Sequence, residues 1–149
     1  MARSKATPPP PIDTPDQVEQ RFYEALQRAD LDALMSVWAD DEDISCVHPG
    51  GPRLIGHGPI RSAFESIFAN GAVDATARKV RRLQTSACAV HSVIEQIGVK
   101  TAEGPQFAWV VATNVYLHGP TGWRMVSHHA SPGTERELQD QVESASVLH

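Results

Sequence analysis

Cysteine is scarce in this chain of 149 residues, which has only Cys46 and Cys88. Neither has a second cysteine at metal-ligand spacing, which excludes a zinc ribbon. The N-terminus lacks the apolar segment of a signal peptide, and no hydrophobic run approaches the roughly 18 residues that cross a bilayer. We therefore expect a cytoplasmic protein that does not enter a membrane, with both cysteines as buried thiols.

Positive charge is also in the minority, because 13 basic residues face 18 acidic ones and the net charge is -5. A general nucleic-acid binder needs a concentrated basic face, so we expect no nucleic-acid partner. The basic run from Arg78 to Arg82 is better explained as a solvated strand edge that discourages pairing than as an anion site. The sequence also lacks a phosphate-binding glycine loop, a dinucleotide fingerprint and a nucleophile elbow. No cofactor is expected.

The length suits one domain, and hydrophobic residues, at 41%, suffice for one core. Residues 1–13 include Pro8 to Pro11, and proline there predicts a disordered, extended tail; a proline-rich ligand for a partner domain is the alternative. Residues 14–132 form the predicted domain. Residues 133–149 are a polar tail, with a loosely held helix expected between Thr134 and Leu148.

Three helices are expected in the first half of the chain. Thr14 and Pro15 mark a helix start, and the helix should run to Ala29. Asp30 caps a second, short helix that stops in the acidic run 40–43, and Pro59 opens a third that ends near Gly71. In the first helix the apolar stripe is Val18, Phe22, Leu26 and Ala29, and the polar face is Glu19, Gln20, Glu24 and Gln27.

Strands dominate the second half. A short strand from Ile44 to His48 is followed, after the third helix, by long strands at residues 77–88, 89–99, 107–118 and 122–131. Helices first and a meander of strands afterwards indicate an α+β fold.

The last two strands form a predicted hairpin around Gly119 to Gly122. With that loop Asn114 faces Ser127, and Asn114 and His129 share one face of the hairpin. A mid-strand asparagine must be hydrogen-bonded if buried, so this is the best polar pair that the pattern gives. A single bulge would reverse the assignment of faces.

His48 is the main candidate for chemistry, because it ends a strand directly before the loop Pro49-Gly50-Gly51. Two explanations of His48 are open. It has an acid–base or ligand-binding role, or it is a structural histidine that is hydrogen-bonded to loop carbonyls. Asp43 is the nearest carboxylate in sequence, with a solvated helix end as its alternative. His128 and His129 point to opposite faces of their strand and do not chelate one metal ion together, so no metal site is predicted.

Taken together, these residues resemble a known family. The Trp38-containing helix, His48-Pro49-Gly50-Gly51 and Gly56-x-x-x-Ile60 are similar to the SnoaL-like members of the nuclear-transport-factor-2-like superfamily. The ending from Gly122 to Pro132, GWRMVSHHASP, is similar to the group related to the association domain of calmodulin-dependent protein kinase. The resemblance implies a cone-shaped fold, with a curved, mostly antiparallel sheet around three N-terminal helices. It also implies a pocket inside the cone and a homodimer through the outer sheet face.

Three functions remain open on this basis. The first is a homodimer that binds an unknown small molecule. The second is a lyase or isomerase of a small apolar substrate, with His48 as base and Asp43 or His129 in support. The third is an oligomerisation module. The expected ligand-binding residues are Trp38, His48, Trp109, Asn114 and His129.

Overall fold

Thr14 begins the first helix of the computed structural model, which describes residues 10–134 and 140–143. Its hydroxyl accepts a hydrogen bond from the Gln17 amide at 3.1 Å, and Pro15 occupies the first helical position, where no backbone donor is needed. Helix α1 (Pro15–Arg28) ends at Ala29 in the left-handed conformation. The carboxylate of Asp30 then caps helix α2 (Leu31–Ser36). Both starts were correctly predicted from the sequence.

The remaining elements are strands β1 (Ser45–Val47) and β2 (Arg53–Ile55), helix α3 (His57–Ala69), and strands β3 (Asp74–Gln84), β4 (Cys88–Thr101), β5 (Gly104–Gly119) and β6 (Gly122–Pro132). Within the described residues they form a single sheet in the order β2-β1-β6-β5-β4-β3. Neighbouring strands are antiparallel except β1 and β6. The α+β prediction is confirmed. Strand β2 was not predicted, because three residues between two Pro-Gly-rich breaks carry too little pattern.

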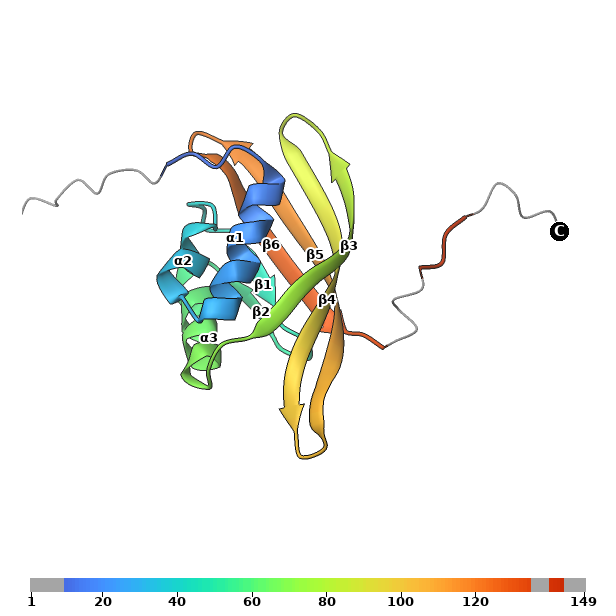
Figure 1. Ribbon diagram of the computed structural model, residues 1–149. Helices are drawn as coiled ribbons and strands as arrows, with labels where there is room; N and C mark the ends of the chain where they lie inside the picture. The colour runs from blue at the N-terminus through green and yellow to red at the C-terminus, as the bar shows by residue number, and fades with distance from the viewer. Residues whose placement is uncertain (1–9, 135–139, 144–149) are drawn as a thin grey trace, which may run out of the picture.

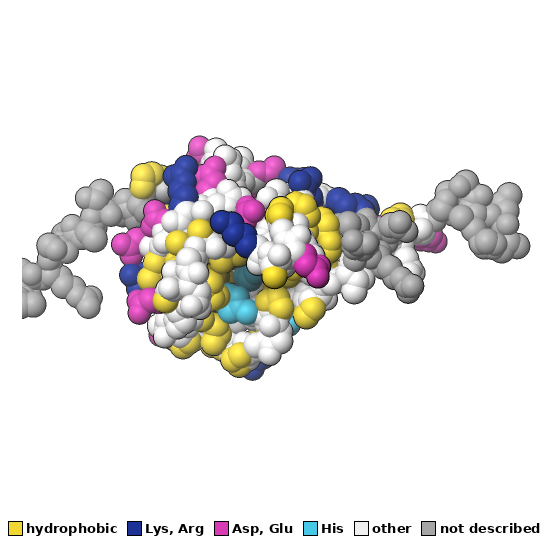
Figure 2. All heavy atoms as spheres, turned by 60° about the horizontal axis from the view of Figure 1, so that its bottom comes forward, with side chains coloured by type: hydrophobic (Ala, Val, Ile, Leu, Met, Phe, Trp, Pro, Cys, Tyr) yellow, Lys and Arg dark blue, Asp and Glu magenta, His cyan; other side chains and the backbone are white. Residues whose placement is uncertain are grey.

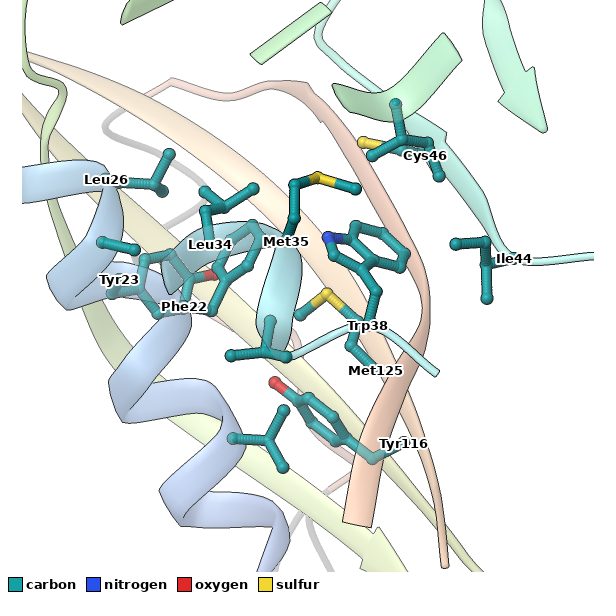
Figure 3. Packing of buried hydrophobic residues seen from close by; sticks show 14 of the residues in the cluster. Phe22, Tyr23, Leu26, Leu34, Met35, Trp38, Ile44, Cys46, Tyr116 and Met125 are labelled. Atoms are coloured by element: carbon teal, nitrogen blue, oxygen red, sulfur yellow. The ribbon is translucent and has the colours of Figure 1, made fainter. Parts of the chain in front are cut away.

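All three described helices lie on one side of the curved sheet (Figure 1). The core between them contains Phe22 from α1, Trp38 after α2, and Tyr116 and Met125 from the sheet (Figure 3). Phe22 and Tyr116 are completely shielded from solvent. Among the described residues no helix has the length and apolar character needed to cross a membrane.

The basic run lies on β3, which is one edge of the sheet in the described residues. A bulge between Arg78 and Arg81 interrupts its pairing with β4, and Lys79 has a positive φ of 49°. Charges and a bulge together protect an edge strand from pairing with another chain. The interpretation of this run as a strand edge is confirmed.

The chain before Thr14 differs from the predicted tail where the structure describes it, from Pro10 onward. Ile12 is buried and pairs with the β5–β6 turn, its amide donating to the Thr121 carbonyl and its carbonyl accepting from the Trp123 amide. Gly122 has a φ of +82°, and a Cβ there would collide with the Ile12 backbone. The run of prolines concealed this contact, because proline predicts an extended chain whether or not it packs. Residues 1–9 lie outside the described residues.

The C-terminal helix expected between Thr134 and Leu148 falls mostly outside the described residues. Those described there, Thr134 and residues 140–143, have no helical structure.

Candidate functional site

A pocket of about 200 Å³ lies between α1, α3 and the inner face of the sheet. Three side chains with titratable groups reach it: His48 from the loop after β1, Glu95 from β4 and His128 from β6. Figure 2 shows histidine side chains in a hollow between hydrophobic side chains at this end of the molecule. The hydrophobic walls include Phe22, Leu26, Phe64, Ile67, Ile97 and Val110.

Larger hollows exist, but they are open surface grooves. One, of about 710 Å³, lies over the acidic run Asp40 to Asp43 beside His57. Another, of about 660 Å³, lies along β3 and β4 at Arg81 and Leu83. Neither combines apolar walls with converging polar groups in the way a small-molecule site does, whereas the inner pocket does.

Strand alternation explains how polar groups enter the interior. Alternate residues of β4 point toward the helices, and among them are His91 and Glu95. On β5 the inward positions include Asn114 and Tyr116, and both are completely buried. The polar residues thus occupy positions that the pattern reserves for core.

The hairpin register differs from the prediction because of a bulge. Tyr116 pairs with Met125 but Val115 pairs with Ser127, so Val126 has no partner of its own on β5. Beyond the bulge the faces are exchanged: Asn114 pairs with His128, which is buried, and His129 is exposed. The predicted pair of Asn114 and His129 is therefore wrong, and the actual pair is Asn114 and His128. A bulge depends on the energetics of both strands and leaves no clear sign in either one.

A hydrogen-bond network next to the pocket joins four side chains: Tyr23, Glu95, Asn114 and His128. The Tyr23 hydroxyl donates to Glu95 Oε2 at 2.7 Å, and Asn114 Nδ2 donates to the Tyr23 hydroxyl at 3.1 Å. Because Asn114 uses its amide nitrogen as the donor, its Oδ1 accepts from His128 Nδ1 at 2.5 Å. The proton of His128 is thereby assigned to Nδ1. Its Nε2 carries a lone pair 3.9 Å from Glu95 Oε2.

The network continues along α1 through Glu19, whose Oε2 accepts from Tyr116 at 2.7 Å and faces Asn114 Nδ2 at 3.5 Å. The same oxygen lies 2.8 Å from His91 Nδ1. Glu19 was assigned to the solvated face of this helix, which is wrong. Glu19 is three residues before Phe22 and seven before Leu26, so helical periodicity places it on their apolar stripe. The spacing therefore indicated burial, but the charge of Glu19 favoured the solvated face.

Burial shifts the protonation of the groups at the pocket. It raises the pKa of Glu95 to about 7, with the hydrogen bond from Tyr23 opposing the rise and the charge of Glu19 adding to it. Burial, together with the smaller effects of the charges of His48 and His129, lowers the pKa of His128 to about 3. Burial also lowers the pKa of His48. At neutral pH the pocket therefore offers neutral imidazoles beside a carboxyl group that is close to half ionised.

The expected site residues are divided by the structure. His48 lies at the pocket, its ring 6.5 Å from that of His128 between centroids, and Asn114 lies behind His128. Trp38 is core rather than pocket wall, and its Nε1 has no hydrogen-bond partner among the described residues. Trp109 and His129 lie on the outer face of the sheet.

Asp43 is exposed in the acidic run and lines the surface groove there, not the pocket that contains His48. The carboxyl group beside the histidines is that of Glu95, which sequence reasoning missed. A charged residue inside the run Val93-Ile94-Glu95-Gln96-Ile97 is the signal that was available.

Comparisons with known proteins agree with this architecture. The family model described as the SnoaL-like domain matches residues 16–135. A protein from Thiobacillus denitrificans, provisionally named a calcium/calmodulin-dependent protein kinase type II association domain, is 33% identical; the match covers 85% of this chain and 100% of that chain, with a TM-score of 0.77. A protein from Streptomyces avermitilis, provisionally named a dehydratase of the NTF2-like family, is 32% identical over 80% of this chain and 99% of its own, with a TM-score of 0.69.

More distant structures share the fold alone. The CaMKII hub of S. rosetta is 19% identical over 78% of this chain and 92% of its own, with a TM-score of 0.62. No curated protein matches the chain in sequence.

Proposed function

The chain belongs to the family of SnoaL-like domains, and from this premise we propose that it binds a small, mostly apolar molecule in the pocket beside His48, Glu95 and His128. The observation that carries the proposal is the convergence of these polar groups in an otherwise hydrophobic pocket of about 200 Å³. Since liquid water occupies about 30 Å³ per molecule, this space equals about seven waters and suits a small ring compound.

The protonation of the pocket narrows the chemistry of the ligand. His128 and His48 are disfavoured as cations, so they offer little attraction to an anion. Glu95 repels a carboxylate once it is ionised. The pocket therefore favours a neutral ligand with a carbonyl or hydroxyl group. The carbonyl oxygen of such a ligand would accept a hydrogen bond from protonated Glu95, or its hydroxyl would donate one to His128 Nε2.

A pocket-filling variant tests this proposal. In Ala130→Leu the added side chain occupies the pocket, while His129→Gln changes the adjacent residue on the outer face. A set of small cyclic ketones, phenols and alcohols is screened by thermal shift and ligand-observed NMR. We expect compounds that bind the wild type and His129→Gln but not Ala130→Leu. Binding that survives in a folded Ala130→Leu variant places the ligand elsewhere.

A lyase or isomerase is the second candidate, favoured by the pKa of Glu95 of about 7. A general acid or base works best when its pKa is near the working pH, and Glu95 is also oriented by Tyr23. This proposal makes Glu95 the base, a role that the sequence assigned to His48, and puts Glu95 in place of Asp43 as the carboxylate of the site. His48 and His128 then act as supporting hydrogen-bonding groups, with His128 in place of the predicted His129.

Exchange of protons for deuterium tests the catalytic proposal without a known substrate. Each bound ketone is incubated in D2O and its α-protons are followed by NMR. We expect exchange in the wild type and in Asp43→Asn, and its loss in Glu95→Gln with binding retained. Exchange at the wild-type rate in Glu95→Gln removes this carboxyl group from the mechanism, and no exchange with any bound ketone removes this class of reaction.

We also propose that the outer sheet face forms a homodimer. Phe107 and Leu117 are exposed there, with Trp109 and Val111 half-buried beside them. An apolar sheet face of this kind is a usual site of association, and the similar protein from Thiobacillus denitrificans is provisionally named an association domain.

Light scattering with Val111→Lys tests the dimer. A lysine on the proposed interface should give monomers, whereas Gln106→Lys, nearer the hairpin end of the same strand, should leave dimers. A wild type that is monomeric at all concentrations, or a dimer that Val111→Lys leaves intact, contradicts this interface.

A further inference from the structure

Asp16, Glu19 and His91 form a second polar cluster, away from the pocket, where α1 crosses β4. One ligand atom from each lies within 4.8 Å of the others. Asp16 is in the first turn of α1, Glu19 is one turn later, and His91 points toward them from the sheet. The cluster is connected to the rest of the interior through Tyr116, which donates to Glu19.

His91 is the unusual member of this cluster. Its side chain is completely buried, and its Nε2 has no hydrogen-bond partner among the described residues. Its Nδ1 lies 2.8 Å from Glu19 Oε2, a carboxylate oxygen, so Nδ1 is the donor. In neutral His91 the lone pair is therefore on Nε2, which lies 4.0 Å from Asp16 Oδ1. This buried lone pair of His91 faces the Asp16 carboxylate, and no positively charged group among the described residues lies between them.

Solvent ions have access to this position. Asp16 and Glu19 line an open groove of about 440 Å³ between α1 and β3. The Asp16 side chain is 61% exposed. Metal bonds of about 2.0–2.2 Å to nitrogen and oxygen span up to about 4.4 Å between two ligand atoms. The 4.0 Å between Asp16 Oδ1 and His91 Nε2 therefore leaves room for one ion between them.

We propose that Asp16 and His91 Nε2 bind a divalent first-row transition metal ion of the zinc type, with Glu19 as the carboxylate that orients His91 through Nδ1. Imidazole selects such ions over magnesium and calcium, which prefer oxygen ligands. Two carboxylates balance the charge of the ion. Glu19 accepts from His91 Nδ1 and from the Tyr116 hydroxyl, so it orients the imidazole from behind, as second-layer groups do in metal sites.

Arg82 competes with the ion for Asp16. Its Nε lies 2.8 Å from Asp16 Oδ1, and both side chains are largely exposed. Metal binding must displace or share this contact. Removal of Arg82 should therefore strengthen metal binding, whereas removal of a ligand should weaken it. These opposite effects on metal affinity distinguish a metal site from a simple ion pair.

Calorimetry with Zn²⁺ and absorption spectroscopy with Co²⁺ test the site in the full-length chain. We expect one site, a cobalt spectrum with nitrogen ligation, and no response to Mg²⁺. His91→Gln removes a direct ligand, so affinity should fall by more than the roughly 10- to 100-fold typical of second-layer changes. Asp16→Asn should weaken binding, and Arg82→Gln should strengthen it by about two- to fivefold, the usual worth of an exposed ion pair.

His129→Gln and His57→Gln are matched controls, because both histidines are exposed and outside the cluster. Their affinity for Zn²⁺ should equal that of the wild type. Wild-type protein that binds neither Zn²⁺ nor Co²⁺ overturns the proposal, as does equal affinity for Mg²⁺. If His91→Gln does not fold, the exposed variants decide: unchanged affinity in both Asp16→Asn and Arg82→Gln also overturns it.

Discussion

Glu95 is a carboxyl group in the middle of β4, with Val93 and Ile97 on the same inward side of the strand. Burial there stabilises the protonated form, so the folded protein holds this proton more tightly than the unfolded chain does. The stabilisation is complete below the ordinary pKa of 4.5, and it is lost as the pH rises through about 7. One residue thus connects the pocket chemistry with the pH dependence of folding.

Glu95→Gln should remove this dependence, because glutamine accepts the hydrogen bond from Tyr23 without ionising. Between about pH 5 and pH 8 the wild type should lose on the order of 2 kcal/mol relative to the variant. Urea unfolding at a series of pH values measures the difference. Glu103→Gln in the exposed β4–β5 turn is the control and should follow the wild type. If the free energy of unfolding changed with pH in the same way in Glu95→Gln and the wild type, ionisation of Glu95 would be no less favourable in the folded protein than in the unfolded chain.

Helix α1 supplies Phe22 to the pocket, Tyr23 to the network and Glu19 to the proposed metal site. Its ends therefore affect all of these positions together. Thr14 caps its beginning well, but its end is strained, because Ala29 adopts a φ of 52° that favours glycine.

Ala29→Gly should relieve this strain and raise the free energy of unfolding by about 0.5–1 kcal/mol. Gln20→Gly, at an exposed position inside the same helix, should lower it by about 1 kcal/mol. Both changes are measured by urea unfolding at fixed pH. A loss of stability in Ala29→Gly would mean that the flexibility of glycine in the unfolded chain outweighs the strain at the helix end.

At the scale of the whole molecule, the chain before α1 joins the sheet to the helices. Arg124 on β6 donates to the Pro10 carbonyl and to the Ser36 carbonyl, each at 3.0 Å. Ile12 fills the space between these contacts and the β5–β6 turn, with 1% of its surface exposed. This segment therefore belongs to the fold and is not a tail.

Ile12→Ala should cost about 2–4 kcal/mol, the usual range for removing a buried aliphatic side chain. Thermal or urea unfolding measures the loss. Asp13→Ala, at the next and exposed position, should change the stability by about 0.5 kcal/mol or less. A similar, small effect of both substitutions would return residues 10–13 to the role of a tail that the sequence suggested.

The sequence by itself determined the α+β class of this protein and all of its described helices and strands except β2. Helix starts at Thr14 and Asp30 are encoded by local capping groups, and the long strands by alternation of side chains, both of which act over a few residues. The resemblance carried by His48-Pro49-Gly50-Gly51 and the GWRMVSHHASP ending led to the correct family and to the curved sheet around the helices.

Only the tertiary structure decided which polar groups meet. Because of the bulge at Val126, His128 rather than His129 faces the interior. The packing of α1 against the sheet buries Glu19 and Glu95. The physical reason is that strand register and the burial of a charge depend on the summed free energy of contacts between distant segments, which no single segment encodes. The site is consequently a product of packing, whereas the elements that carry it are products of local sequence.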